Sequence, residues 1–293
     1  MHGLGNDFVM VDCLQTLPPP EEKMAALSEA VCTHHFGVGG DGLILILPDN
    51  EADFRMRMWN PDGSESEMCG NGIRCFGKYL YDAGLVKKST ISVATAKGLQ
   101  QIEIQAGDAA PGATTIMVRV DMGAPRLARS QIPMIVDDGH HEADQVINEP
   151  LQVDGTKYSI TAVSMGNPHV VIFVDDVESV ALKEIGFKIE HHEAFPERTN
   201  AHFVQVLGPK KLWMRSWERG AGDTLACGTG ACAVTVATAL NGRLPGSDRR
   251  ALVHLPGGDL DIEWASNNHV YMTGPATTVF SGELDREFLN GIQ

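Results

Sequence analysis

The sequence predicts an α/β protein of two pseudo-symmetric halves, each a strand-rich, β-barrel-like domain around one central helix. The stretch WNPDGSESEMCGNGIRCFG at residues 59–77 returns 158 positions later as WERGAGDTLACGTGACAVT at residues 217–235. Most other segments are short alternating or β-branched runs between Gly, Pro, Asn or Asp, which is typical of strands. Apolar residues at helical spacing follow each Cys-Gly pair. A repeat this long indicates two copies of one domain, not a solenoid.

The repeat extends upstream of the cysteine motif. GLGNDFVMVD matches SMGNPHVVIFV and pairs Asn6 with Asn167, and HFGVGGDGLILIL matches AFPERTNAHFVQVL and pairs Asp41 with Asn200. The segment MGAPRLA around Gly123 has the composition of a linker. We therefore expect one half to cover residues 1–122 and the other to cover 123–273.

The strands and helices of the first half follow from local pattern. We expect strands at 6–12, 42–47, 53–59, 90–96, 99–105 and 114–122. We expect the central helices at 72–86 and 230–244, each stopped by a glycine, Gly84 or Gly242. A further packing helix is expected at 21–34, after three prolines.

Composition excludes several classes of function. The chain of 293 residues carries 23 Lys and Arg against 38 Asp and Glu, a net charge of -15 that repels nucleic acid and anionic lipid. Apolar stretches such as LILIL are too short to cross a bilayer. Six cysteines without a CxxC pair or His-rich spacing indicate a reducing compartment, free thiols and no metal site.

Cys69 and Cys227 are the candidate reactive groups. Each stands in the turn before a predicted helix, where unpaired backbone N–H groups and the helix dipole favour the thiolate. The glycines that follow keep the backbone open to a ligand anion; they are Gly70, Gly72, Gly228 and Gly230. If the halves face each other across a pseudo-two-fold axis, the two thiols lie on opposite faces of one bound anion.

That arrangement predicts inversion of a carbon centre by proton transfer. One thiolate removes a proton from one face, and the other group, as a thiol, returns a proton to the opposite face. Fixed N–H donors stabilise the charge that develops on an adjacent carboxylate. The chemistry needs no cofactor, and the sequence holds no dinucleotide fingerprint or phosphate-binding P-loop.

The motifs GLGNDF, NPDGSESEMCGNGIRC, SMGNPH, FPERTNAHF, WERGAGDTLACGTGACA and HVYMTGPA closely resemble the diaminopimelate epimerase family over nearly the whole chain. The cysteine motifs alone also suit other cofactor-independent racemases of similar fold, such as proline racemase. The resemblance implies an isomerase that converts LL-2,6-diaminopimelate to the meso form for lysine biosynthesis, without pyridoxal phosphate. It also implies that the last strand returns to the first half, which assigns residues of about 274–293 there, and that the active site lies in the cleft between the halves.

The resemblance assigns a role to each motif residue. Cys69 and Cys227 are the paired acid and base, and His169 with Glu218 is similar to the pair that sets cysteine protonation. Asn6 and Glu218 bind the reacting amine. The remaining substrate contacts implied are the backbone of Gly70, Asn71, Gly228 and Thr229 around the reacting carboxylate, and the side chains of Asn60, Asn167, Asn200 and Arg219 at the distal end.

One position departs from the family pattern. Many members read GxGxDQ where this chain has GVGGDG, so Gly42 replaces a glutamine that contacts the reacting amine. This form is similar to plant and cyanobacterial members, which leaves the bacterial cytoplasm or a plastid stroma as the location. The family also implies a homodimer. The molecule that the protein binds is expected to be a small amino acid, its substrate diaminopimelate. The alternatives are a racemase for another amino acid and a non-catalytic amino-acid-binding protein.

Overall fold

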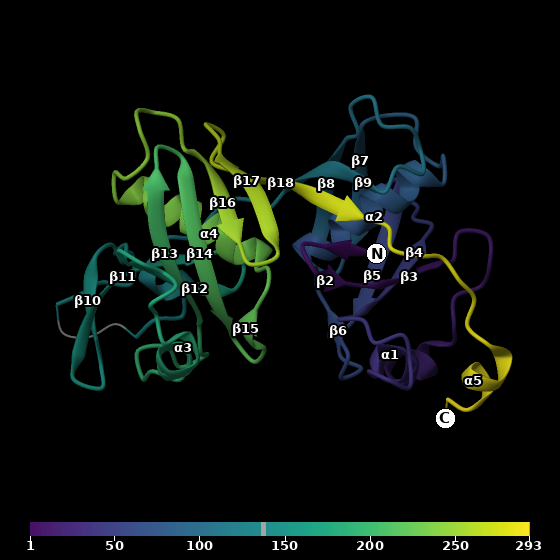
Figure 1. Cartoon of the computed structure of the whole chain (residues 1–293), viewed down its shortest axis with the longest axis horizontal. Coiled ribbons are helices and arrows are strands. Elements are labelled where there is room, and N and C mark those ends of the chain that lie inside the picture. The colour runs from purple at the N-terminus through teal and green to yellow at the C-terminus, as the bar shows by residue number, and fades with distance from the viewer. Residues whose placement is uncertain (136–138, 293) are drawn as a thin grey trace. The chain divides into compact units, whose positions relative to one another are not determined.

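The computed structural model describes residues 1–135 and 139–292, and it divides into two compact units (Figure 1). Unit 1 comprises Met1–Val120 and Gly274–Gln293, and unit 2 comprises Asp121–Thr273. Strand β18, Val270–Thr277, runs from unit 2 into unit 1, where His2 pairs with Thr277. In the described part of the chain, no helix is long and apolar enough to cross a membrane.

Unit 1 carries mostly short strands, one long central helix and shorter helical segments. In chain order its elements are β1 His2–Gly3, β2 Asn6–Asp7, β3 Val9–Asp12, η1 Glu21–Lys23, α1 Met24–Cys32, β4 Leu43–Leu47, β5 Phe54–Trp59, β6 Glu65–Ser66, α2 Gly70–Asp82, β7 Thr90–Thr95, β8 Gly98–Gln105, β9 Thr115–Asp121 and α5 Arg286–Asn290. The six predicted strand segments and the helix predicted at 21–34 are confirmed, with ends that differ by a few residues.

Unit 2 repeats this order of short strands around one long central helix. Its elements are η2 Arg129–Gln131, β10 Glu149–Val153, β11 Thr156–Ser164, β12 Pro168–Phe173, α3 Leu182–Glu190, β13 Asn200–Gly208, β14 Lys211–Glu218, β15 Gly222–Thr224, α4 Gly228–Leu240, β16 Arg250–Leu255, β17 Gly258–Trp264 and β18.

The two units share their strand pairing, which confirms the predicted pseudo-symmetry. Strands β3 and β4 are parallel on either side of α1, as β12 and β13 are on either side of α3. In unit 1, β5 pairs antiparallel with β4 and parallel with β7. In unit 2, β14 pairs antiparallel with β13 and parallel with β16. Antiparallel pairs β7–β8 and β16–β17 continue the order.

The central helices α2 and α4 have matching ends. Cys69 and Cys227 are their extended N-caps, and neither side chain caps its own helix. Both helices end in a left-handed glycine, Gly84 or Gly242, which glycine adopts without the strain of a Cβ. Ten residues in each helix are buried by the surrounding strands. Strand packing therefore fixes the place of both cysteines.

Two features of the fold differ from the sequence prediction. Helix α3 was not predicted, because Leu182–Glu190 is short and contains Gly186. Gly186 is required by packing: a Cβ there would lie 2.5 Å from Cβ of Trp217. The returning segment of about 274–293 was expected to carry the last strand, but β18 ends at Thr277 and the short helix α5 follows it.

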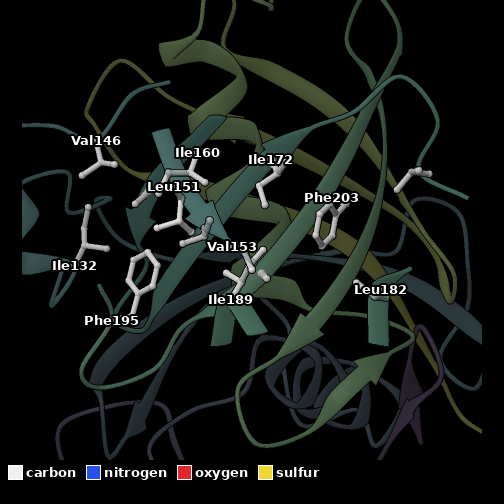
Figure 2. Close-up of a cluster of buried hydrophobic side chains, with 14 residues drawn as sticks. Ile132, Val146, Leu151, Val153, Ile160, Ile172, Leu182, Ile189, Phe195 and Phe203 are labelled. Carbon is white, nitrogen blue, oxygen red and sulfur yellow. The ribbon is translucent and has the colours of Figure 1, made fainter. Parts of the chain in front are cut away.

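The core of unit 2 includes a cluster between α3 and the strands beside it (Figure 2). Phe203 of β13, Ile172 of β12 and Leu151 of β10 are buried together with Leu182 and Ile189 of α3. Burying a Leu, Ile or Phe side chain contributes about 1.5–3 kcal/mol. This cluster fixes β12 and β13, the strands that carry the histidines of the candidate site.

Candidate active site

The residues predicted as functional form two groups, one in each unit. The Cys69 half-site comprises Cys69, Asn71, Asn6 and Asp41 of unit 1. The Cys227 half-site comprises residues of unit 2: Cys227, Glu218, Thr224, Thr229, Asn167, His169, His202 and Ser216.

Asn6 is the centre of the Cys69 half-site. Its amide oxygen accepts hydrogen bonds from Nδ2 of Asn71 at 3.1 Å and from the thiol of Cys69 at 3.7 Å. Its Nδ2 donates to Oδ2 of Asp41 at 2.8 Å. Both ends of the amide are engaged, so Asp41 and Asn71 fix its orientation beside the thiol.

Asp41 was absent from the predicted site. Its Oδ2 also accepts from the backbone N–H of Asp7 at 3.1 Å. Burial first, and then the nearby Asp41 carboxylate, raises the pKa of Asp7. The alignment of Asp41 with Asn200 in the internal repeat was the signal that could have identified it.

Two other predicted positions in unit 1 have local roles. Asn60 lies in the turn after β5, where its Nδ2 donates to Oγ of Ser64 at 3.0 Å. Gly42 faces the backbone, since a Cβ there would lie 2.9 Å from the carbonyl oxygen of Trp59. This backbone therefore has no room at Gly42 for a side chain as large as glutamine.

Cys227 begins α4 and its thiol faces Glu218 at the end of β14. The thiol donates to the Glu218 carboxylate, and Thr224 of β15 donates to the same carboxyl group through Oγ1. The hydroxyl of Thr229 lies 3.8 Å from Sγ of Cys227. Cys227 and Glu218 are therefore one coupled pair at the start of the helix.

Two histidines extend the Cys227 half-site. Nδ1 of His169 lies 2.9 Å from Nε2 of His202, and Nε2 of His169 donates to Oδ1 of Asn167 at 2.9 Å. Nδ1 of His202 lies 2.9 Å from Oγ of Ser216. The amide Nδ2 of Asn167 donates to Oγ1 of Thr229 at 3.5 Å. This chain of contacts connects β14, β13 and β12 to the first turn of α4.

His169 and Glu218, which were predicted to act as a pair, make separate contacts. Among the hydrogen bonds of the described residues, His169 bonds His202 and Asn167, while Glu218 bonds Thr224 and Cys227. The two groups thus contact the cysteine region separately. His202, Ser216 and Thr224 were missed, because polar residues within strands carry no sequence signal of this network.

The last two predicted residues lie beside this network. Asn200 donates through Nδ2 to the carbonyl of Pro168 at 2.7 Å and accepts from the backbone N–H of Arg219 at 2.9 Å. The exposed Arg219 donates through Nη1 to the carbonyl of Glu197 at 2.9 Å. Asn200 therefore fixes the backbone of Arg219, the residue that carries the guanidinium.

The expectation of a thiolate at Cys227 is wrong for the free protein. Burial raises the pKa of Cys227 well above its ordinary value, and the adjacent Glu218 carboxylate raises it further. The backbone N–H of Gly230, in the first turn of α4, lowers this pKa, but it does not offset burial. Burial also raises the pKa of Glu218. Cys227 is therefore a thiol.

The backbone at two of the predicted glycines is crowded by the protein's own side chains. A Cβ at Gly72 would lie 2.8 Å from Cδ1 of Ile44, and one at Gly230 would lie 2.4 Å from Cε1 of His202. Packing within the protein therefore favours glycine at both positions, in addition to any approach of a ligand to the backbone there.

The buried histidines predict a loss of stability in acid. Burial lowers the pKa of His202 from 6.5 to about 3, and that of His169 well below 6.5. Between pH 6.5 and the lowered pKa values of the folded state, these histidines bind protons in the unfolded chain but not in the folded one. The free energy of unfolding that they contribute is therefore fully present above pH 6.5 and is lost as pH falls. Each histidine contributes a slope of about 1.4 kcal/mol per pH unit.

Urea unfolding from about pH 8 to about pH 5, compared between wild type and His202→Gln, measures this slope. The variant should lose less stability per pH unit than the wild type, because it lacks one of the two buried imidazoles. Equal pH dependence in both proteins would contradict neutral burial of His202.

The fold is shared with solved structures of low sequence identity. A probable proline racemase from Agrobacterium radiobacter K84, solved with bound carbonate, is 14% identical and aligns with a TM-score of 0.65 over 97% of this chain and 92% of that chain. This likeness, with the matched units, defines a two-domain protein of the proline racemase-like epimerase fold.

Sequence comparison narrows the class to one family. The model for the diaminopimelate epimerase family matches residues 1–128 and 161–279. The diaminopimelate epimerase of Pelotomaculum thermopropionicum is 54% identical over 282 residues, 96% of each chain. That of Desulfitobacterium hafniense is 50% identical over 291 residues, 99% of this chain and 98% of the other. The chain belongs to the diaminopimelate epimerase family.

Proposed function

We propose that this protein interconverts LL-2,6-diaminopimelate and meso-2,6-diaminopimelate in lysine biosynthesis, as an isomerase that needs no cofactor. The observation that carries the proposal is the matched pair of cysteines, each the N-cap of a buried central helix, in a chain of this family. A helix N-terminus offers unpaired N–H groups and a positive dipole to a carboxylate. The donors proposed are the backbone groups of Gly70, Asn71, Gly228 and Thr229.

The protonation state of Cys227 supports a division of labour. In the free protein Cys227 is a buried thiol that donates to Glu218, so it is ready to act as the acid. Cys69 would then be the base that removes the α-proton from the other face of the substrate carbon. In the reverse direction the two groups exchange roles. This requires the two half-sites to meet in a cleft between the domains, which we propose as the active site.

The same proposal places the substrate. Asn6, whose amide is fixed by Asp41, would accept a hydrogen bond from the reacting amine of the substrate, and Glu218 would accept another. The planar guanidinium of Arg219 matches a carboxylate bidentately, so it would hold the distal carboxylate. The other distal contacts proposed are the side chains of Asn60, Asn167 and Asn200. His169 would orient Asn167, to which its Nε2 is bonded.

The wider assignments follow from the family. We propose two domains that correspond to residues 1–122 with about 274–293, and to 123–273. We propose a homodimer located in the cytoplasm. The relatives described above come from Pelotomaculum and Desulfitobacterium, and they lend no support to a plastid location.

An assay with two substrates tests the proposal. The reduced protein, without added cofactor, should equilibrate LL- and meso-diaminopimelate, whereas lysine should be a very poor substrate because it lacks the second carboxylate that Arg219 would bind. Chiral chromatography of the products measures both reactions. Comparable turnover of lysine would favour a general amino-acid racemase, and binding of diaminopimelate without any turnover would favour a binding protein.

A further inference from the structure

Three metal-binding donor groups meet in the Cys227 half-site. His169 lies on β12, His202 on the adjacent β13, and Cys227 at the start of α4. One donor atom from each residue lies within 4.8 Å of the other two, and all three side chains are buried. The proposed function gives His202 no part in the chemistry.

The outer nitrogens of both rings are already held. Nε2–H of His169 donates to Oδ1 of Asn167, which leaves the lone pair on Nδ1. Nδ1 of His202 contacts the hydroxyl of Ser216, which can either donate or accept. His202 can therefore carry its proton on Nδ1 and present a bare Nε2. Bonds of this kind to the outer nitrogen are the usual second shell of a metal-bound histidine.

Both imidazoles are fully buried, and so is the thiol of Cys227. Cys227 must lose its proton to bind a metal, and the charge of the cation would offset the cost of burying its thiolate.

The spacing needs only small shifts to fit a tetrahedral ion. Bond lengths of about 2.0–2.1 Å to nitrogen and about 2.3 Å to sulfur separate two nitrogens by about 3.3 Å and nitrogen from sulfur by about 3.6 Å. The two ring nitrogens are 2.9 Å apart, so the rings would separate slightly while the sulfur lies within 4.8 Å of both.

We propose that Cys227, His169 and His202 bind one soft divalent cation, of which Zn²⁺ is the representative. Binding replaces the S–H bond of Cys227 with a sulfur–metal bond and releases one proton to solvent, with no change of oxidation state. A sulfur held by a cation cannot donate a proton, so the cation inhibits epimerisation until a chelator removes it. The inhibition rests on the proposed function, whereas the binding does not.

Co²⁺ is the probe, because a cobalt–thiolate bond gives a charge-transfer absorption that reports directly on cysteine ligation. Metal-free, reduced wild type should bind one equivalent of Co²⁺ with this band, and Zn²⁺ should displace it. The band should disappear in Cys227→Ser and be strongly weakened in His202→Gln. Ser216→Ala should lower affinity by about 10- to 100-fold, the usual effect of losing a second-shell partner.

His254→Gln is the matched control. His254 lies on β16 of the same unit and bonds Asp259, outside the cluster, so its loss should leave the band unchanged. A folded wild type with no thiolate band at excess Co²⁺, or a band that survives Cys227→Ser, would overturn the site. Stoichiometric cobalt binding in a protein that epimerises nothing when metal-free would overturn the proposed function and leave the site standing.

Discussion

Replacement of either Cys69 or Cys227 by alanine should reduce the rate of diaminopimelate epimerisation by about 10²- to 10⁴-fold, the usual effect of removing one proton-transfer group. The loss should be similar for the two variants, because the reaction passes a proton through both positions. The double variant should fall little further, since the pair acts as a unit. Substrate binding should survive in each variant, because the proposed carboxylate donors are backbone N–H groups of α2 and α4.

Cys75→Ala is the control for the loss of a cysteine. Cys75 lies in α2 with no exposed surface, and burial raises its pKa to about 12, so it packs as a small apolar side chain. Its replacement should lower stability and leave turnover intact, as should Cys13→Ala and Cys32→Ala. Near-normal epimerisation by Cys69→Ala or Cys227→Ala, measured with ligand affinity on the same samples, would contradict a two-base mechanism.

Gly230→Ala should cause the other large loss. The added Cβ would lie 2.4 Å from Cε1 of His202 and 2.9 Å from Sγ of Cys227, distances that require a shift. Displacing a reacting group by about 1 Å can cost about 100-fold in rate, and overpacking a core costs about 1–3 kcal/mol. We therefore expect a fall in kcat of about 100-fold together with a lower free energy of unfolding.

Two variants test whether crowding of the new methyl group against His202 causes the expected loss of activity in Gly230→Ala. Gly208→Ala adds the same methyl group at the end of β13, where no atom lies within 4 Å, and it should leave activity unchanged. His202→Ala combined with Gly230→Ala removes the ring that blocks the methyl group and should recover part of the rate. Wild-type kinetics in Gly230→Ala would show that the start of α4 is not packed as described.

The sequence was sufficient to predict the repeated architecture. Trp, Cys and paired glycines, which are uncommon residues, recur at a fixed offset in the sequence. They recur because each occupies an equivalent place in the two units. Cys69 and Cys227 thus mark the starts of equivalent helices, and Gly84 and Gly242 mark their ends. Local pattern was also enough for α1, but not for α3, where tertiary packing against Trp217 demands a glycine inside a helix.

The network around Cys227 could not be predicted from sequence. His202 lies among apolar residues in NAHFVQV, and its position next to His169 depends on the parallel register of β12 and β13. The protonation of Cys227 depends on burial, which the helix N-terminus does not offset. Such burial results from contacts with strands far away in the sequence, so motif spacing carries no information about it.

The central claim, that two thiols act on opposite faces of one carbon, is tested most directly by epimerisation in deuterated water. The reduced protein, without cofactor, should convert LL-diaminopimelate to meso product that carries deuterium at the newly inverted α-carbon from the first turnovers. The reason is that the returned proton comes from a second thiol, equilibrated with solvent, and not from the group that removed the first. Mass spectrometry and NMR of early product and recovered substrate give the result. Early meso product that retains the original protium would contradict the two-base account, and no exchange with any stereoisomer in a folded sample would contradict epimerisation itself.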